Sequence, residues 1–126
     1  MAASLGGCGS SHTRPGSVAQ VTERDFHISA PAELRAGKLL LRVKNEGPDR
    51  HELIIVPSHA AALPLRPDGF TVDEEAVEAQ EPGSLEPGAP GSVRYLAVDL
   101  APGRYTFFCN MEGHFMGGMH TEVQVN

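Results

Sequence analysis

The sequence contains no tryptophan, few basic side chains and no long apolar run. Its 126 residues include 10 Lys and Arg against 16 Asp and Glu, which gives a net charge of −6. Because no basic stripe is present to neutralise phosphates, DNA and RNA are excluded as partners. No stretch reaches the roughly 18 consecutive apolar residues of a transmembrane helix, so no segment is expected to span a membrane.

Cysteine is also scarce, with only Cys8 and Cys109 in the chain. Cys8 lies in a segment rich in Gly and Ser, whereas Cys109 follows a run of aromatic residues that is typical of a strand. A disulfide between them would tie a tail to a core strand, and we do not expect one. The two cysteines therefore provide no disulfide framework, and each needs an explanation of its own.

Glycine and proline are plentiful, at 14 and 10 residues, and helix-favouring runs are scarce. This composition favours a domain of short strands joined by many turns. A chain of this length buries one modest core. We expect a flexible tail over residues 1–17 and a single domain over residues 18–126.

Within the tail, Leu5-Gly6-Gly7-Cys8-Gly9 resembles the cleavage box of bacterial lipoproteins, in which the cysteine is lipidated. This resemblance makes residues 1–17 the remnant of a lipoprotein signal and a tether, with a lipid anchor at Cys8. The domain is then expected outside the cytoplasm, in the periplasm or on the outer face of the cell membrane. The alternative is an untethered Gly-rich tail in which the cysteine is incidental.

Alternation of apolar and polar residues predicts strands through most of the domain. The expected strands are residues 25–30, 38–45, 52–56, 92–100, 104–109 and 119–125. Turn-forming residues separate them, most clearly at residues 45–49 and 101–103. Several short strands with turns between them predict an all-β protein, an antiparallel β-sandwich.

Residues 57–91 break this pattern, because they are rich in Pro, Gly and Ala and too long for a hairpin loop. Residues 73–80 are expected to form a short acidic helix of about two turns. From Pro67 to Val93 there are seven acidic residues and no Lys or Arg. We interpret this insertion as a solvated acidic loop, with a docking patch for a basic partner such as a cytochrome as the alternative.

The chemically informative segment contains Cys109, His114 and Met119, each separated from the next by four residues. Strand alternation directs the sulfur atoms of Cys109 and Met119 toward the same interior. A fourth ligand is expected from elsewhere in the chain. His51 is the best candidate, because it shares the inward face of its strand with Leu53.

Two imidazoles, a thiolate and a weak axial thioether form a site suited to copper electron transfer. Zinc would favour four strong ligands, and the second cysteine that such a site requires is absent. A nucleophilic pair of Cys109 and His114 would benefit from a helix N-terminus or a cation that lowers the thiol pKa. Cys109 instead ends a strand, so we predict a site for one copper ion and no enzyme.

The same residues resemble the cupredoxins, the family of plastocyanin, azurin and sulfocyanin, over about residues 18–126. The matching residues are Leu100-x-Pro102-Gly103-x-Tyr105-x-Phe107-x-Cys109-Asn110-x-x-Gly113-His114 through Met119, and Asn45-x-Gly47 followed by His51-Glu52. The resemblance implies a Greek-key β-sandwich with a type 1 copper ion at one end and a tyrosine corner at Tyr105. It further implies a partly exposed His114, ringed by Met111, Phe115 and Met116.

The leading hypothesis is a monomeric type 1 (blue) copper protein that passes single electrons between redox partners, such as a cytochrome or a membrane oxidase. The alternative is an extracytoplasmic copper chaperone or copper-buffering protein. It is favoured by the Cu(I)-binding side chains of Met111, Met116, Met119 and His120 in the site loop. A third option is an open site to which Met119 does not bind.

Overall fold

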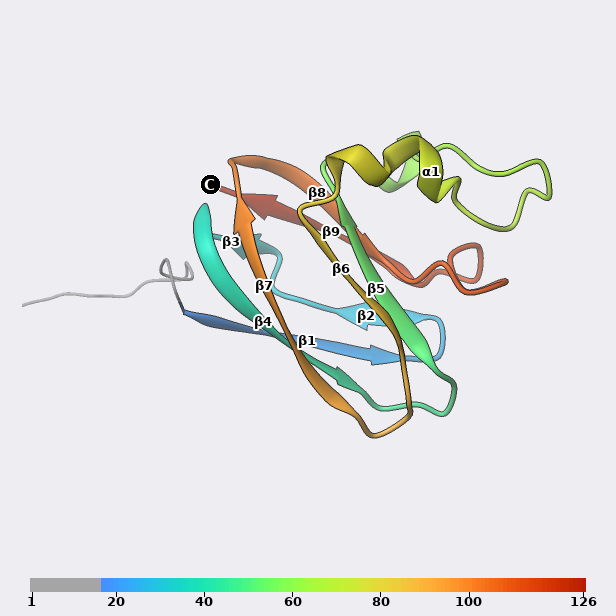
Figure 1. The fold of residues 1–126 in the computed structure, drawn as a ribbon, viewed down its shortest axis with the longest axis horizontal. Helices are drawn as coiled ribbons and strands as arrows, with labels where there is room; N and C mark the ends of the chain where they lie inside the picture. Colours follow the sequence, from blue (N-terminus) through green and yellow to red (C-terminus); the bar gives the residue numbers. More distant parts are fainter. Residues whose placement is uncertain (1–16) are drawn as a thin grey trace, which may run out of the picture.

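The computed structural model describes residues 17–126, which form two β-sheets packed face to face (Figure 1). One sheet has the order β2 (His27–Ser29), β1 (Val18–Arg24), β4 (Gly37–Asn45) and β7 (Val93–Leu100). The other has the order β3 (Glu33–Leu34), β9 (His120–Val125), β8 (Gly103–Phe108), β5 (His51–Val56) and β6 (Gly83–Gly88). The hypothesis of a lipoprotein anchor at Cys8 falls outside the described residues.

The expected all-β sandwich is confirmed, but its sheets are mixed rather than purely antiparallel. β1 pairs with β4 in parallel, from Val18 opposite Leu40 to Glu23 opposite Asn45. β3 also pairs with β9 in parallel. Parallel neighbours arise because the chain crosses to the other sheet between β2 and β4, so that β4 returns beside β1 in the same direction.

The core lies between the two sheets and follows the alternation of the strands. In β4, Leu39, Leu41 and Val43 are buried, as the sequence predicts, and in β9 Val123 and Val125 are buried. Each fully buried Leu or Val side chain contributes about 1.5–3 kcal/mol through the hydrophobic effect. The buried residues on the inner faces of the two sheets form one continuous cluster. This cluster also includes Cys109 and Met119, so the candidate site is part of the core.

A tyrosine corner is present as the resemblance implies. The hydroxyl of Tyr105 donates a hydrogen bond of 2.7 Å to the carbonyl oxygen of Ala101. This bond ties β8 to the turn after β7. It has a structural role, at the end of the sandwich where β4 begins opposite Leu100.

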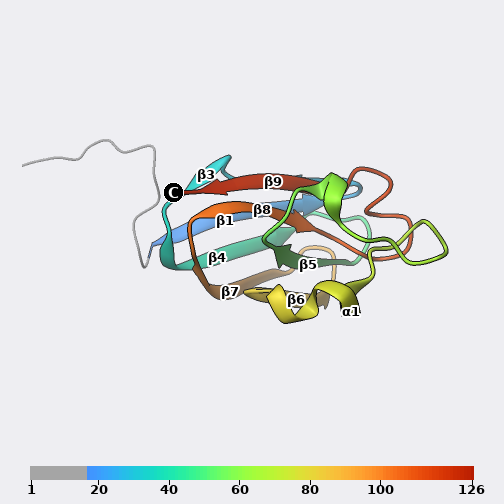
Figure 2. The same cartoon turned by 90° about the horizontal axis from the view of Figure 1, so that it is seen from above.

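The insertion at residues 57–91 is more ordered than a solvated loop. It contains the 3-10 helix η2 (Ala60–Ala62), the helix α1 (Glu74–Val77), the 3-10 helix η3 (Glu78–Gln80) and the strand β6. The expected acidic helix is therefore present, as one α-helical and one 3-10 turn. Figure 2 shows α1 on the same side of the molecule as β6 and β5. The insertion packs over a second, smaller apolar cluster made of Ile54, Val56, Leu63, Val72, Val77, Phe108 and Phe115.

The expected strand at residues 25–30 is wrong at its beginning. Asp25 and Phe26 form the two-residue turn between β1 and β2, with Arg24 paired to His27. Phe26 is 48% exposed and has a φ of 61°, so it does not share the buried face of Ile28. The reason is the chain reversal itself: a two-residue hairpin loop needs positive φ, which alternation of side chains does not reveal.

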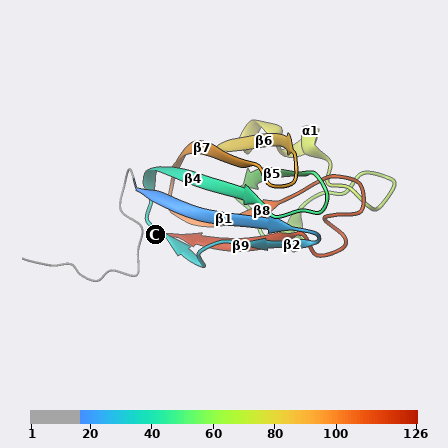
Figure 3. The ribbon, with the colours of Figure 1, turned by 90° about the horizontal axis from the view of Figure 1, so that it is seen from below.

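Three connections meet at one end of the sandwich: the β1–β2 turn, the β4–β5 loop and the loop between β8 and β9 (Figure 3). The carboxyl terminus lies at the opposite end. The predicted copper ligands come from the first of these two ends.

Candidate metal centre

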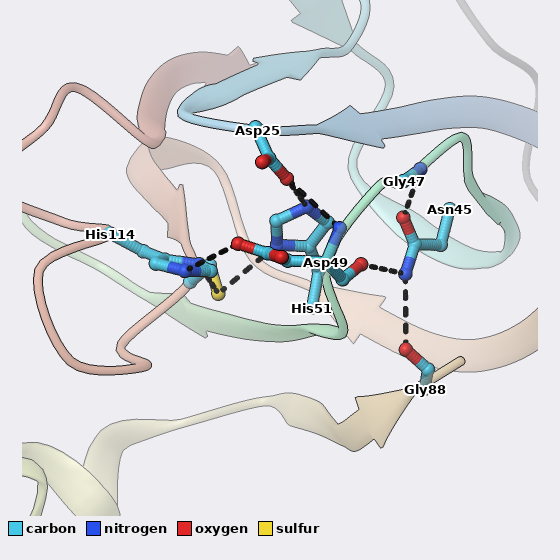
Figure 4. Close-up of polar contacts among 8 residues, drawn as sticks. Asp25, Asn45, Gly47, Asp49, His51, Gly88 and His114 are labelled. Atoms are coloured by element: carbon cyan, nitrogen blue, oxygen red, sulfur yellow. Dashed lines mark hydrogen bonds and ion pairs between the residues drawn. The ribbon is translucent and has the colours of Figure 1, made fainter. Parts of the chain in front are cut away.

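Three of the four predicted ligands come together in the structure. His51 is the first residue of β5, Cys109 directly follows β8, and His114 lies in the loop before β9. The Sγ of Cys109 is 3.9 Å from Nδ1 of His51 and 3.5 Å from Nδ1 of His114 (Figure 4). All three ligand atoms lie within 4.8 Å of one another, and all three residues are buried.

Met119 lies beside this group. Its side chain is fully buried in the same cluster as Cys109. Its backbone closes the loop, because Cys109 N donates to Met119 O at 3.2 Å and Met119 N donates to His114 O at 3.0 Å. The position agrees with the predicted axial ligand, and its coordination stays a prediction.

The loop between Cys109 and Met119 folds into tight turns that bring His114 back over the strand ends. His114 N donates to Met111 O at 2.8 Å, and Gly118 N donates to Phe115 O at 3.0 Å. Gly118 has a φ of 110°, a conformation that side-chain-bearing residues rarely adopt. Glycine in this loop thus permits tight turns, which keep His114 close to the ends of the strands.

The distances satisfy a simple geometric test for a bound ion. Metal–nitrogen bonds of about 2.0–2.1 Å and metal–sulfur bonds of about 2.3 Å place three trigonal donors roughly 3.5–4 Å apart. The two measured sulfur–nitrogen separations lie in this range. Two imidazoles and a thiolate with a methionine nearby are the donor set of a type 1 copper site, so the residues present fit that ion.

Burial controls the protonation of the site. Desolvation raises the pKa of the Cys109 thiol to about 11 and lowers the pKa of His51. Both changes favour neutral side chains in the metal-free protein. Binding of a metal ion therefore has to displace the thiol proton.

Each ligand imidazole has a carboxylate on its far side. Nε2 of His51 forms a hydrogen bond of 3.0 Å with Oδ1 of Asp25, and Nε2 of His114 lies 3.7 Å from Oδ2 of Asp49. Figure 4 shows both carboxylates turned toward the rings. The sequence did not reveal these two residues, because their proximity depends on the β1–β2 turn meeting the β4–β5 loop.

Buried amide side chains hold the surrounding loops. Asn45, 1% exposed, donates to the carbonyl oxygens of Asp49 and Gly88, both at 3.0 Å, and accepts a hydrogen bond from Gly47 N at 2.7 Å. These bonds tie the β4–β5 loop to β6, and so fix the segment that carries Asp49 and begins β5 at His51.

The surroundings of His114 differ from the implied exposed ligand. His114 is 7% exposed, and Phe115, 7% exposed, packs against Phe108 with ring centroids 5.6 Å apart. The ring that covers His114 belongs to Phe26, in an edge-on contact at 5.4 Å. Met116 is 53% exposed. A groove of about 380 Å³ adjoins the ligand and is lined by Pro48, Asp49, Arg50, Pro90, Met111 and His114.

No protein-family model and no curated protein matches this chain. Several solved structures do match this chain. A reduced auracyanin from Roseiflexus castenholzii is 21% identical, with 87% of this chain and 96% of that chain covered and a TM-score of 0.65. Auracyanin A from Chloroflexus aurantiacus, described as a "blue" copper protein, is 18% identical, with 88% and 100% covered and a TM-score of 0.65. Rusticyanin from Thiobacillus ferrooxidans is 12% identical, with 95% and 85% covered and a TM-score of 0.59. The chain therefore has the cupredoxin fold, as the sequence resemblance predicted.

Proposed function

We propose that this chain with the cupredoxin fold is a type 1 copper protein that passes single electrons between redox partners. His51, Cys109 and His114 would hold the ion, with Met119 as a weak axial ligand. The observation that carries the proposal is the buried cluster of one sulfur and two imidazole nitrogens, all within 4.8 Å of one another.

A bound copper ion would supply the one-electron couple, alternating between Cu(II) and Cu(I). The protein would supply a fixed frame for both states. His51 and Cys109 stand at the ends of the neighbouring strands β5 and β8, and hydrogen bonds hold the loop that carries His114. Little can rearrange when an electron arrives or leaves, and this favours fast transfer.

We propose no catalytic role for the chain. Within residues 17–126, this cluster is the one group of three or more His, Cys, Asp and Glu side chains arranged to hold a metal. Copper oxidases and nitrite reductases need further metal centres. A single buried centre beside a shallow groove agrees with a carrier that has no substrate of its own.

We further propose that the domain works as a monomer outside the cytoplasm, with Cys8 as a lipid anchor. No helix among the described residues is long and apolar enough to cross a membrane. The partners would be redox proteins, such as a cytochrome or a membrane oxidase. A Cys8→Ala variant should partition to membranes less than the parent protein expressed in the same way, and equal partition would argue against the anchor.

An absorption spectrum after addition of one equivalent of Cu(II) tests the proposed function. We expect an intense visible band from thiolate-to-copper charge transfer, which disappears on reduction and in a Cys109→Ser variant. A Met119→Leu variant should keep the band with a changed position and potential if Met119 is the axial ligand. A protein that binds no copper would contradict the proposal.

Copper handling is the second candidate, because Met111 lines the groove beside His114 and Met116 is exposed in the same loop. These thioethers would suit Cu(I) capture. Competition with a Cu(I) chelator separates the two functions. A carrier keeps its ion through repeated redox cycles, whereas a chaperone releases Cu(I) readily and binds Cu(II) without the intense band.

A further inference from the structure

The two ligand imidazoles are arranged in the same way. Each presents Nδ1 to the sulfur of Cys109, at 3.9 Å for His51 and 3.5 Å for His114. Each presents Nε2 to a carboxylate, Asp25 at 3.0 Å and Asp49 at 3.7 Å. The same arrangement therefore occurs on two histidines that come from different parts of the chain. This indicates that the two carboxylates are part of the metal centre.

The carboxylate of Asp25 selects the tautomer of His51 that a metal ion needs. A neutral imidazole has one N–H and one lone pair. When Nε2–H faces a carboxylate, the lone pair remains on Nδ1 and points at the cluster. A carboxylate partner also increases the basicity of the ligating nitrogen.

A single carboxylate oxygen of Asp25 connects the ring of His51 to the backbone of Asp49. Oδ1 of Asp25, which accepts the hydrogen bond from His51, also lies 3.1 Å from the backbone N–H of Asp49 and accepts its hydrogen bond. The β1–β2 turn is thereby fastened to the β4–β5 loop. A shift of Asp25 would move both the ring of His51 and the segment that carries the carboxylate facing His114.

We propose that Asp25 is a positioning residue of the metal centre, which fixes Nδ1 of His51 toward the ion, and that the charges of Asp25 and Asp49 together stabilise the more highly charged Cu(II) state. The inference rests on the proposed function for the identity of the ion. The part of the inference that concerns the orientation of the His51 ring depends on the protein alone and not on the identity of the ion.

The two carboxylates should differ in how strongly they stabilise Cu(II). The side chain of Asp25 is 25% exposed and that of Asp49 is 55% exposed. Coulombic interactions weaken in water, and salt screens exposed charges over about 10 Å at 0.1 M. Asp25 should therefore have the larger effect, and the effect of Asp49 should shrink as salt is added.

Two cations oppose the carboxylates: Arg50 lines the groove beside His114, and Arg94 contacts His51. A guanidinium nitrogen of Arg94 donates to the backbone oxygen of His51 at 3.2 Å, from the β7 side of the residue. The charges of both side chains favour Cu(I). Because Arg50 and Arg94 are unchanged in the Asp variants, comparison with the parent protein isolates the contribution of each carboxylate.

The test is the midpoint potential of the copper-loaded protein and its variants. Asp25→Asn preserves the shape of the side chain and removes its charge. We expect the ratio of Cu(II) to Cu(I) affinity to fall about tenfold, which raises the potential by about 59 mV for a one-electron couple. Asp49→Asn should raise it less, and high salt should abolish that rise. Asp99→Asn, an exposed carboxylate on β7 at the opposite end, is the matched control and should leave the potential unchanged.

A second measurement uses the copper-free protein. In a ¹⁵N NMR spectrum, the ring of His51 should be in the Nε2–H tautomer, and Asp25→Ala should remove this preference. A spectrum that shows the Nδ1–H tautomer in the parent protein would overturn the positioning role.

The outcomes separate the inference from the proposed function. If the parent protein lacks the charge-transfer band, the proposed function fails, while the NMR measurement still decides the orientation of His51. If the band is present and Asp25→Asn has an unchanged or lowered potential, the role of the carboxylates is overturned and the carrier function stands.

Discussion

At the scale of single residues, Glu23 is the most unusual side chain in the core. It follows Ala19 and Val21 on the inward face of β1 and is fully buried. Neither carboxyl oxygen has a hydrogen-bond partner among the described residues. Burial is the main reason that the pKa of Glu23 rises from 4.5 to about 8, against the opposing charge of Arg94.

From the raised pKa of Glu23 we predict how the free energy of unfolding depends on pH. Between about pH 4.5 and pH 8 the folded state keeps the proton that the unfolded state releases. The free energy of unfolding therefore falls as pH rises through this window, by at most about 1.4 kcal/mol per unit, and levels off above it. In Glu23→Gln the part of the fall that comes from Glu23 should disappear, because the amide carries no proton to lose, while Glu52, whose pKa burial raises to about 7, keeps its own part.

Urea unfolding at about pH 5 and about pH 8 checks this prediction. The parent protein should lose stability between the two values, and Glu23→Gln should lose clearly less and be the more stable of the two at the higher pH. Equal losses in both proteins would mean that Glu23 has an ordinary pKa in the folded state.

At the scale of elements, Asn110 connects the insertion to the site loop. Its side chain, in a residue 5% exposed, accepts a hydrogen bond of 2.7 Å from Val72 N and donates to Val72 O at 2.9 Å and to a Glu74 carboxylate oxygen at 2.7 Å. Its own backbone N–H donates to Glu52. Asn110, the residue next to Cys109, thus contacts both the start of α1 and the beginning of β5.

Asn110→Ala should be strongly destabilising, because it leaves the buried N–H and C=O of Val72 without partners. Each unsatisfied group costs about 1–3 kcal/mol. We expect a loss of roughly 2–5 kcal/mol in the free energy of unfolding, measured by urea titration. Gln20→Ala, which removes an amide on the surface of β1, should cost about 0.5 kcal/mol or less. Similar values for the two variants would show that Asn110 does not join the insertion to the loop.

The elements also show what the sequence could predict. The strand expected at residues 38–45 is observed as Gly37–Asn45, because its alternation is regular and its inward side chains are apolar. β1 was missed, since an alanine and a glutamate occupy inward positions in it. β6 was missed because Gly and Pro within it are typical of a turn, and as an edge strand beside β5 it tolerates them.

The candidate site also contains residues that the sequence revealed and residues that it did not. The gathering of these side chains was predictable because Cys109, His114 and Met119 are close in the sequence and His51 opens a strand with a clear inward face, while their role as ligands stays a prediction. Asp25 and Phe26 were assigned to a strand, and the turn that they form brings them to the imidazoles. Such contacts depend on tertiary packing between the two sheets, which leaves no periodic signal in the sequence.

At the scale of the whole molecule, the net charge of −6 should govern encounters with reductants and oxidants. At the site end, Asp49 is exposed in the β4–β5 loop beside the exposed Arg50, and Glu112 is exposed in the site loop, so the local charge there is also negative. A cationic partner is therefore attracted and an anionic one repelled, in both cases more strongly at low salt.

Stopped-flow kinetics with small inorganic reductants checks this expectation. The bimolecular rate constant with a cationic complex should fall as ionic strength rises, and that with an anionic complex should increase. A rate that is independent of salt for both reagents would show that charge does not guide the approach to this protein.

In the proposed electron carrier, Phe26 would extend a route for an electron from His114 to the surface. The ring is 48% exposed, while the imidazole of His114, whose centroid is 5.4 Å away, belongs to a residue only 7% exposed. In the proposed carrier, a partner that docks over the β1–β2 turn would meet this aromatic ring before it meets His114. Electronic coupling decays with every ångström of empty gap, so a ring in that gap shortens the through-space tunnelling distance to His114. The ring covers only one side of the imidazole, because the groove beside Asp49 and Met111 opens on another, so the two sides would give an electron two different ways to reach His114.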